Sequence, residues 1–267
     1  MFVLFKHLKS SHFYILFALI FIATFLGVLF GTSYYSVKST YYLKSLPQNY
    51  KTGINVLLTA SDDDSTSIDY IAVLSMNPQK QTVEITPIQT DTLVKIVDNN
   101  HPIKNVYSVG GADMFVQKIT ELTNMDITFY SFSKFSTLKN ILYTYGKLDL
   151  NTKKYDKTLV NAKDIFEIIK DIKKNGNTKE KEAFFTTVTK EFLNQKTYGE
   201  WIDKTPDLIR EFVQYSDTNF KLSDIEIYIA ILKSLSEKDV SVNAVKGTYS
   251  NIDGYTYFLP DSDAFKK

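Results

Sequence analysis

The chain has 267 residues, of which 44% are hydrophobic, 14% aromatic and 23% charged. This size and composition can bury a substantial core in one domain or in two small ones. The formal net charge of +1 gives no general attraction to nucleic acid, and the absence of cysteine excludes disulfide frameworks, thiol catalysis and cysteine-based zinc sites.

The first predicted element is a transmembrane helix over residues 13–32. No residue between Lys9 and Lys38 carries a formal charge, and an apolar helix of this length matches a hydrocarbon core of ~30 Å. Because lysines precede the span and no acidic residue lies near it, the positive-inside rule predicts that residues 1–12 form a short cytoplasmic tail. The main domain is then extracytoplasmic on a single-pass cell-membrane protein. A cleaved signal peptide is the alternative, although no clear small-residue cleavage site follows the apolar stretch.

Residues 33–51 are predicted to be an extracytoplasmic spacer, and residues 52–267 the domain. Short β-rich runs bounded by turn residues predict strands, and apolar residues at helical spacing predict helices. The predicted strands are 55–58, 70–76, 82–88, 126–130, 240–245 and 255–259. The predicted helices begin near 110, 135, 162, 182, 205 and 223, although 225–232 alone could be a buried strand. Alternating strands and helices predict an α/β fold, specifically an α/β/α sandwich with a central mixed β-sheet.

Acidic residues stand at the ends of neighbouring predicted strands. Asp62, Asp63 and Asp64 follow the first strand, Asp69 precedes the second, and Asp91 follows the third. Carboxylates grouped in this way can bind a hard cation, because Mg²⁺ takes oxygen ligands and usually shares them with substrate phosphates. A solvated acidic loop made of turn residues is the simpler alternative.

Residues 153–181 form a lysine-rich stretch. Lys170, Lys179 and Lys181 are among the lysines that surround the loop 175–177. A basic loop opposite an acidic, metal-binding loop would suit a pyrophosphate ligand, whereas an exposed, charged helix end is the more common explanation. The sequence has no glycine-rich phosphate loop and no serine nucleophile motif.

The order of these segments resembles the LytR–CpsA–Psr family. Residues 55–62 and 69–78 fall where that family has a strand ending Leu-Gly-x-Asp, then Arg-Ser-Asp-Thr and an apolar strand closing on Asn-Pro. Residues 88–92 fall at its Ile-Pro-Arg-Asp-Thr, and residues 103–111 at its segment ending Ala-Tyr-x-x-Gly-Gly. Residues 170–185 fall at its arginine-rich segment ending Arg-Gln-x-x-Phe.

The resemblance implies a protein that binds a polyprenyl-pyrophosphate lipid and transfers an anionic glycan polymer, such as teichoic acid or capsule, to peptidoglycan. Mg²⁺ is the implied cofactor and would bridge the pyrophosphate. By position, Asp62 and Asp69 would be the metal carboxylates, and Asp69 and Asp91 the catalytic ones. Lys170, Lys179 and Lys181 would bind the pyrophosphate.

The arginine positions of the family are the main departure, because Arg210 is the only arginine among 31 basic residues. Ser67 and Thr90 stand at two of these positions and carry no charge, and lysine lacks the bidentate fork of a guanidinium. One preorganised donor contributes ~2–4 kcal/mol to transition-state stabilisation. Three hypotheses therefore remain: a transferase, a catalytically impaired lipid-pyrophosphate-binding or scaffold protein, and a surface adhesin.

Overall fold

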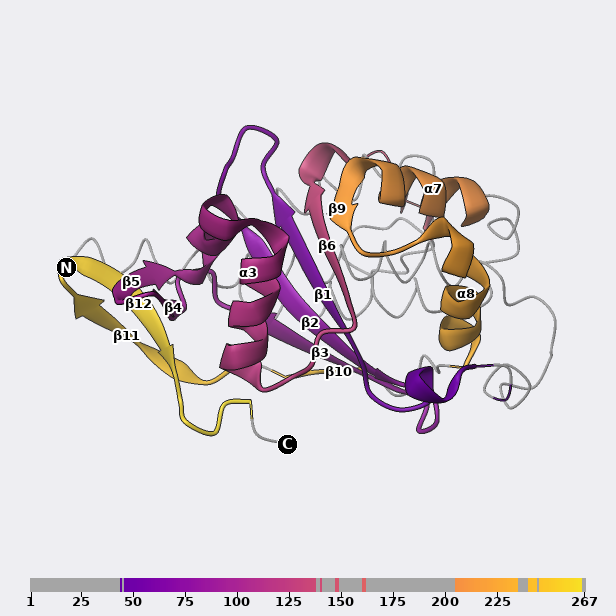
Figure 1. Cartoon of the computed structure of the whole chain (residues 1–267), viewed down its shortest axis with the longest axis horizontal. Helices are drawn as coiled ribbons and strands as arrows, with labels where there is room; N and C mark the ends of the chain where they lie inside the picture. Colours follow the sequence, from indigo (N-terminus) through magenta and orange to yellow (C-terminus); the bar gives the residue numbers. More distant parts are fainter. Residues whose placement is uncertain are drawn as a thin grey trace.

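The computed structural model describes residues 46–137, 205–234, 240–243 and 245–265, with Lys44, Asn140 and the residue pairs 147–148 and 160–161. Six strands form the central sheet: β1 (Ile54–Ser61), β2 (Tyr70–Asn77), β3 (Thr82–Ile88), β6 (Phe129–Lys134), β9 (Ser216–Thr218) and β10 (Val240–Val242). Their order is β10-β3-β2-β1-β6-β9 (Figure 1). The β1–β6 and β3–β10 pairs are parallel and the others antiparallel. The predicted mixed sheet is confirmed.

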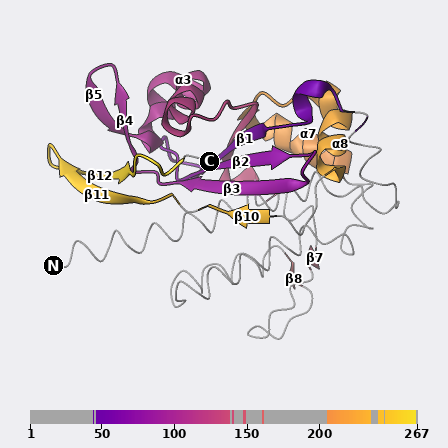
Figure 2. The same cartoon turned by 90° about the horizontal axis from the view of Figure 1, so that it is seen from below.

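Three two-stranded pairs and several helices complete the described elements. The pairs are β4 (Leu93–Ile96) with β5 (Asn99–Pro102), β7 (Lys147–Leu148) with β8 (Val160–Asn161), and β11 (Gly247–Ile252) with β12 (Tyr255–Pro260). The helices are α3 (Val106–Thr123), α7 (Thr205–Tyr215) and α8 (Ile225–Lys233), with 3-10 turns η1 (Gln48–Tyr50), η2 (Ile103–Asn105) and η5 (Leu222–Asp224). Figure 2 shows α3 lying on one face of the sheet.

The main core cluster lies between α3 and that face. Phe115 and Ile119, four residues apart on α3, lie on one side of the helix and are fully buried. They belong to one cluster with Leu57 of β1, Val73 of β2 and Phe132 of β6. The rings of Phe115 and Phe132 meet edge to face, with centroids 5.2 Å apart. This packing fixes the second half of α3 against the middle of the central strands.

The strand predicted at 126–130 is shifted: the observed strand, β6, begins and ends later in the chain. Two residues of β6, Ser131 and Ser133, are polar but buried. Their Oγ atoms are 3.1 Å apart, and the Oγ of Ser133 lies 2.7 Å from that of Ser216 on β9. The second half of β6 is therefore held by serine hydrogen bonds and lacks the apolar residues on which the prediction depended, so its end was missed. Residues 225–232, left open between helix and strand, lie within the helix α8.

The predicted membrane span at 13–32 lies outside the described residues, as do the tail 1–12 and most of the predicted spacer, so they stay predictions. Within the described part of the chain, every helix is too short or too polar to cross a bilayer. At the end of the predicted spacer, Tyr50 of η1 stacks on Phe129, with ring centroids 5.8 Å apart. The predicted helices that begin near 162 and 182 also lie outside the described residues.

Candidate functional site

Two of the predicted carboxylates meet at the loop between β1 and β2, which rises above the sheet in Figure 1. Asp62 follows β1 and Asp69 precedes β2, and the antiparallel pairing of these strands brings both to one edge of the sheet. The backbone N–H of Asp69 donates to the carbonyl oxygen of Ala60 at 2.9 Å. In return, Asp69 Oδ2 accepts a hydrogen bond from the backbone N–H of Asp62 at 2.8 Å. Asp69 therefore closes the loop and holds the two acidic residues together.

Asp91 lies beyond β3, at the same edge. Its Oδ1 accepts a hydrogen bond from Lys104 Nζ at 2.6 Å, and the two side chains are 17% and 36% exposed respectively. The backbone of Lys104 joins two loops, because its N–H donates to the carbonyl of Thr90 at 3.1 Å and its carbonyl accepts from the N–H of Ile68 at 2.9 Å. Lys104 is thus fixed between the segments that carry Ser67 and Thr90.

A second lysine reaches this edge from β6. Lys134 is the last residue of that strand and pairs in parallel register with Ser61, the last residue of β1. Its Nζ donates to the carbonyl oxygens of Asp62 at 3.0 Å and Ser65 at 2.8 Å. The side chain therefore lies across the acidic loop and fixes its conformation.

Sequence reasoning missed Lys104 and Lys134, because both are isolated lysines far from the basic stretch 153–181. The carboxyl ends of parallel neighbours meet at one edge of a sheet. Lys134 reaches the site through such a parallel pairing, which no local pattern specifies, so no sequence signal marked it. For Lys104 the signal was its place within residues 103–111, which fall at a family motif.

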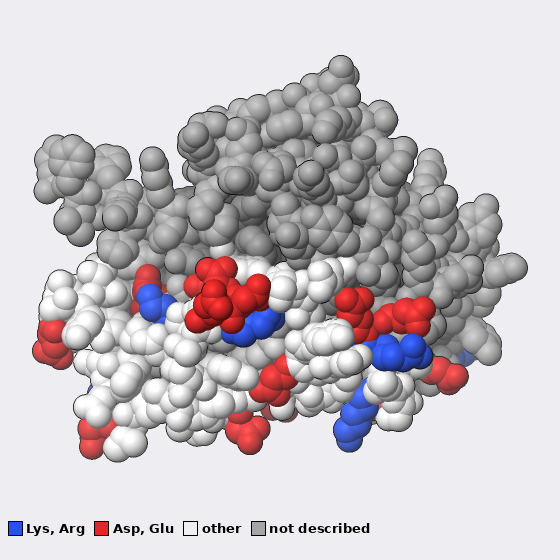
Figure 3. Space-filling view, turned by 90° about the horizontal axis from the view of Figure 1, so that it is seen from above, with Lys and Arg blue, Asp and Glu red and all other residues white. Residues whose placement is uncertain are grey.

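The electrostatics of Asp69 reflect this arrangement. Burial raises the pKa of Asp69 above its ordinary value, the hydrogen bond from the Asp62 backbone lowers it, and the charge of Asp62 raises it again. The charges of Lys104 and Lys134 then lower it in part. Seen from above, acidic side chains gather in a tight group with basic ones directly beside them (Figure 3). The edge thus combines carboxylates and ammonium groups in one small region.

Asp63 has a structural part in the same loop. Its Oδ1 accepts hydrogen bonds from the backbone N–H of Ser136 at 3.2 Å and from the hydroxyl of Ser136 at 2.8 Å. This bonding ties the β1–β2 loop to the chain that follows β6. Asp63 therefore acts as a turn residue, which is the role that the simpler alternative gave to the acidic residues after β1.

Asp62 and Asp69 are the residues that would hold a magnesium ion at this edge. Mg²⁺ prefers near-octahedral oxygen ligands and usually takes one or two carboxylates together with waters and substrate phosphates. One oxygen of Asp69 already accepts the Asp62 amide, and the loop carbonyls of Asp62 and Ser65 accept the Lys134 ammonium, so the second Asp69 oxygen and the Asp62 carboxylate would be the ligands. Among the described side chains, no three acidic, histidine or cysteine residues group as metal ligands. The magnesium prediction stays a prediction.

The three lysines predicted to bind pyrophosphate, Lys170, Lys179 and Lys181, lie outside the described residues. Their placement relative to Asp62, Asp69 and Asp91 therefore stays a prediction. The positive charge that the structure does place against these carboxylates comes from Lys104 and Lys134.

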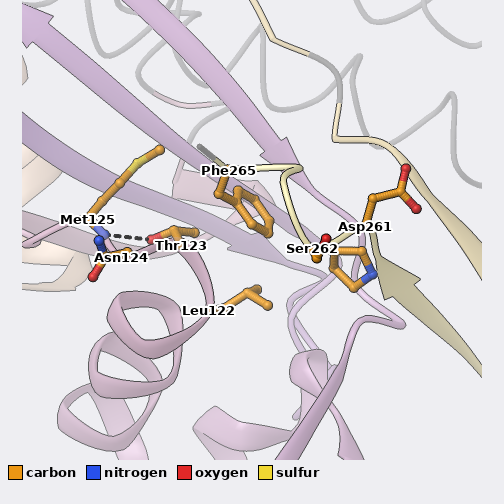
Figure 4. Close-up of a pocket in the computed structure, with 8 residues that line it drawn as sticks. Leu122, Thr123, Asn124, Met125, Asp261, Ser262 and Phe265 are labelled. Atoms are coloured by element: carbon orange, nitrogen blue, oxygen red, sulfur yellow. Dashed lines mark hydrogen bonds between the residues drawn. The ribbon is translucent and has the colours of Figure 1, made fainter. Parts of the chain in front are cut away.

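A separate open pocket of about 710 Å³ lies at the other end of α3. It is formed by residues 122–125 at the end of the helix and by the C-terminal segment 260–265, with Leu122 and Phe265 in its apolar lining (Figure 4). Lys104, by contrast, directly precedes the first turn of α3. The pocket and the acidic edge are therefore distinct features.

Tyr107, in the first turn of α3, provides a test of how this region is held. Its hydroxyl donates to Asp217 Oδ2 on β9 at 2.8 Å, and its ring stacks on Phe132 with centroids 4.4 Å apart. Burial, followed by the hydrogen bond to Asp217, raises the pKa of Tyr107 to about 12. The phenol therefore stays protonated in the folded protein at pH values where it ionises in the unfolded chain.

Tyr107→Phe should lower the free energy of unfolding by about 1 kcal/mol at neutral pH, because one hydrogen bond is lost. The raised pKa adds stability that is complete below pH 10 and is lost as pH rises towards 12. The difference between wild type and variant should therefore shrink over that range. Urea unfolding at pH 8, 10 and 11 measures it. A difference that stays constant with pH would contradict the assigned contact.

Comparisons with known proteins show which family the chain belongs to. The LytR_cpsA_psr family model matches residues 32–168, just over half of the chain. The chain therefore belongs to the LytR–CpsA–Psr family, which confirms the resemblance seen in its motifs.

Its similarity to individual relatives is low. The polyisoprenyl-teichoic acid–peptidoglycan teichoic acid transferase TagU of Bacillus mycoides (strain KBAB4) is 26% identical over 103 residues, covering 37% of this chain and 34% of the relative. TagU of Bacillus subtilis (strain 168) is 22% identical over 246 residues, covering 83% and 77%. The crystal structure of B. subtilis TagV has a TM-score of 0.59 at 16% identity, covering 81% of this chain and 94% of that one. The structural likeness shows a shared fold.

Proposed function

We propose that this chain is a membrane-anchored, extracytoplasmic transferase that moves an anionic glycan polymer from a polyprenyl-pyrophosphate carrier to peptidoglycan. Teichoic acid and capsule are the polymers proposed, and the TagU relatives are named as teichoic acid transferases. The observation that carries the proposal is the pair Asp62–Asp69, held at one edge of the sheet beside Lys104 and Lys134. Family membership supports the choice of substrate class.

The proposed reaction is a phosphoryl transfer. A peptidoglycan hydroxyl attacks the phosphorus atom next to the glycan, the bond between that phosphorus and the bridging oxygen breaks, and polyprenyl phosphate leaves with the electron pair. The hydroxyl proton passes to the Asp69 carboxylate, whose raised pKa makes it a better base near neutral pH. Lys104 and Lys134 neutralise developing negative charge, with the further proposed ligands Lys170, Lys179 and Lys181. Asp91 supports the site by holding Lys104.

The test is transfer of a lipid-linked glycan to peptidoglycan by the purified full chain. We expect the double variant Asp62→Asn with Asp69→Asn to lose at least ~10²-fold in rate, because a positioned base contributes 10²–10⁴-fold. An asparagine oxygen at position 69 can still accept the backbone hydrogen bond of residue 62, so the loop should keep its shape. The matched control is Asp126→Asn, an exposed acid just before β6, at the end of that strand opposite Lys134. Equal rates for the double variant and the control would overturn the proposal.

A second candidate function is a lipid-pyrophosphate-binding scaffold of envelope-polymer assembly without turnover. The observation that favours it is Thr90, which stands at a family arginine position yet is only 1% exposed. A buried, uncharged side chain cannot take the place of a guanidinium that grips phosphate. Binding of the lipid carrier without transfer, in cells whose phenotype survives the double substitution, would support this second function.

A further inference from the structure

The β11–β12 hairpin is joined to the segment that carries Asp91. The backbone N–H of Phe258 on β12 donates to the carbonyl oxygen of Asp91 at 2.9 Å, and Phe258 forms a parallel bridge with Thr92. The Asp91 side chain in turn holds Lys104 at 2.6 Å. Figures 1 and 2 show the hairpin, in yellow, extending beyond the end of the central sheet beside β4. A ligand on the hairpin would therefore lie next to the proposed reaction site.

One face of the hairpin carries two tyrosines. Tyr255 and Tyr257 alternate along β12, so both side chains lie on the same face, and their ring centroids are 6.5 Å apart. Tyr257 is buried, and its hydroxyl donates to the carbonyl oxygen of Asn100 on β5 at 3.3 Å. Tyr255, nearer the turn, is 69% exposed, the largest value for an aromatic side chain in the described part of the chain. Tyr257 thus fixes the hairpin against β5, and Tyr255 is presented to solvent.

The residues around Tyr255 restrict the chemistry of its ligand. Residues 247–260 contain one acidic residue, Asp253 in the turn, and no basic one. An anionic polymer would find no cation on the hairpin, and a lipid surface would have to bury the exposed carboxylate of Asp253. On the tyrosine face, Ile252 lies opposite Tyr255 and Ser250 lies opposite Tyr257. An apolar side chain and a hydroxyl beside an aromatic ring favour a neutral ligand that is both apolar and hydroxyl-rich.

A saccharide has this chemistry. A pyranose ring combines a flat face of C–H groups with a rim of hydroxyls. Tyrosine offers the matching features, an apolar ring face and one hydroxyl that both donates and accepts. It also has few rotatable bonds, so the contact costs little conformational entropy.

We propose that this face of the β11–β12 hairpin binds the uncharged glycan strand of peptidoglycan, with Tyr255 stacking on a sugar ring. The inference rests on the proposed function and deepens it, because it names the surface that holds the acceptor. Tyr255 lies three residues, or about 10 Å, along β12 from Phe258, which is bonded to Asp91. A glycan strand on the hairpin therefore extends towards the carboxylate edge, while Tyr255 takes no part in the bonds that form and break.

The first measurement is binding of the detergent-solubilised full chain to purified peptidoglycan sacculi stripped of anionic polymers, followed by co-sedimentation. Tyr255→Ala should weaken binding by about fivefold or more, the effect expected for one lost aromatic contact, whereas Tyr255→Phe keeps the ring and should stay within about twofold of wild type. Tyr215→Ala, at a tyrosine on α7 that is 58% exposed, is the matched control and should not change binding. Thermal unfolding checks that all three variants are folded.

The second measurement is the transfer reaction with varied acceptor and varied lipid-linked donor. Tyr255→Ala should raise the acceptor concentration that gives half-maximal rate by about the same fivefold factor, because a contact made equally in the ground and transition states is lost. The rate at saturating acceptor and the half-maximal donor concentration should not change.

The other outcomes are separable. Sacculi binding that is absent in wild type, or equal in wild type and Tyr255→Ala, overturns this inference and leaves the proposed function to the transfer assay. A change in the half-maximal donor concentration instead would assign Tyr255 to the lipid-linked substrate or the membrane, and would also overturn it. Sacculi binding that depends on Tyr255, in a wild-type chain that transfers nothing, overturns the transferase proposal and supports the saccharide-binding surface.

Discussion

Replacing Phe115 with alanine should lower the free energy of unfolding by about 3–5 kcal/mol, the range for a large aromatic side chain removed from a core. Phe115 is fully buried and is among the largest side chains in that state. Its ring contacts Phe132 of β6, so the substitution leaves a cavity between α3 and the sheet and removes an aromatic pair. Urea unfolding followed by circular dichroism measures the loss.

Two further substitutions on α3 define the scale of that effect. Phe115→Leu keeps most of the buried volume and should cost clearly less than the alanine variant. Val109→Ala, at a side chain that is 56% exposed, should stay within about 0.5 kcal/mol of wild type. A loss below 1 kcal/mol for Phe115→Ala would mean that α3 does not pack on the sheet as described.

Gly111→Ala should destabilise the protein by about 1–3 kcal/mol, because its backbone conformation is available almost only to glycine. Gly111 lies inside α3 with φ 68° and ψ −164°, which interrupts the helix after its first turn. No atom lies within 4 Å of an added Cβ, so the cost comes from the backbone and not from a clash. The interruption also sets the direction of the turn that carries Tyr107.

A second variant, Ala112→Gly, separates the cost of the Gly111 backbone conformation from ordinary helix propensity. It places a glycine at the next position and should lower the free energy of unfolding by only about 0.5–1 kcal/mol, the usual difference between glycine and alanine in a helix. Transfer of the lipid-linked glycan gives a second readout, because a changed first turn would move Lys104, which lies two residues before the helix. Unchanged stability together with unchanged transfer in Gly111→Ala would show that the kink has no role in holding the site.

Much of the sheet was predictable from local sequence. Residues 70–76 and 82–88 are short, β-rich and bounded by turn residues, and they lie within β2 and β3. The start of β6 was predicted, but its end was not, because buried serines that hydrogen-bond across strands look polar in a hydropathy pattern. The kink at Gly111 was also missed, since a glycine pair before a helix does not reveal which conformation it adopts.

The candidate site was predictable only where its parts are close in sequence. Asp62 and Asp69 flank one short connection between antiparallel strands, so their proximity follows from local pairing. Lys134 contacts the carbonyl of Asp62 from 72 positions away, through a parallel pairing that no local pattern specifies. The long basic stretch is visible in the sequence because its lysines are closely spaced, whereas the two lysines that reach this edge of the sheet are isolated.

The parallel pairing of β3 with β10 has a consequence for how the protein acquires its structure. Asn243 Nδ2, just after β10, donates to Glu84 Oε1 at 3.2 Å from 159 positions away. During synthesis from the N-terminus, β3 therefore emerges long before its outer neighbour. Such long-range pairing slows folding, and an unpaired strand edge can associate with other chains. The nascent domain would pass through a stage that favours assistance from a chaperone, and completion of the sheet would mark the end of that stage.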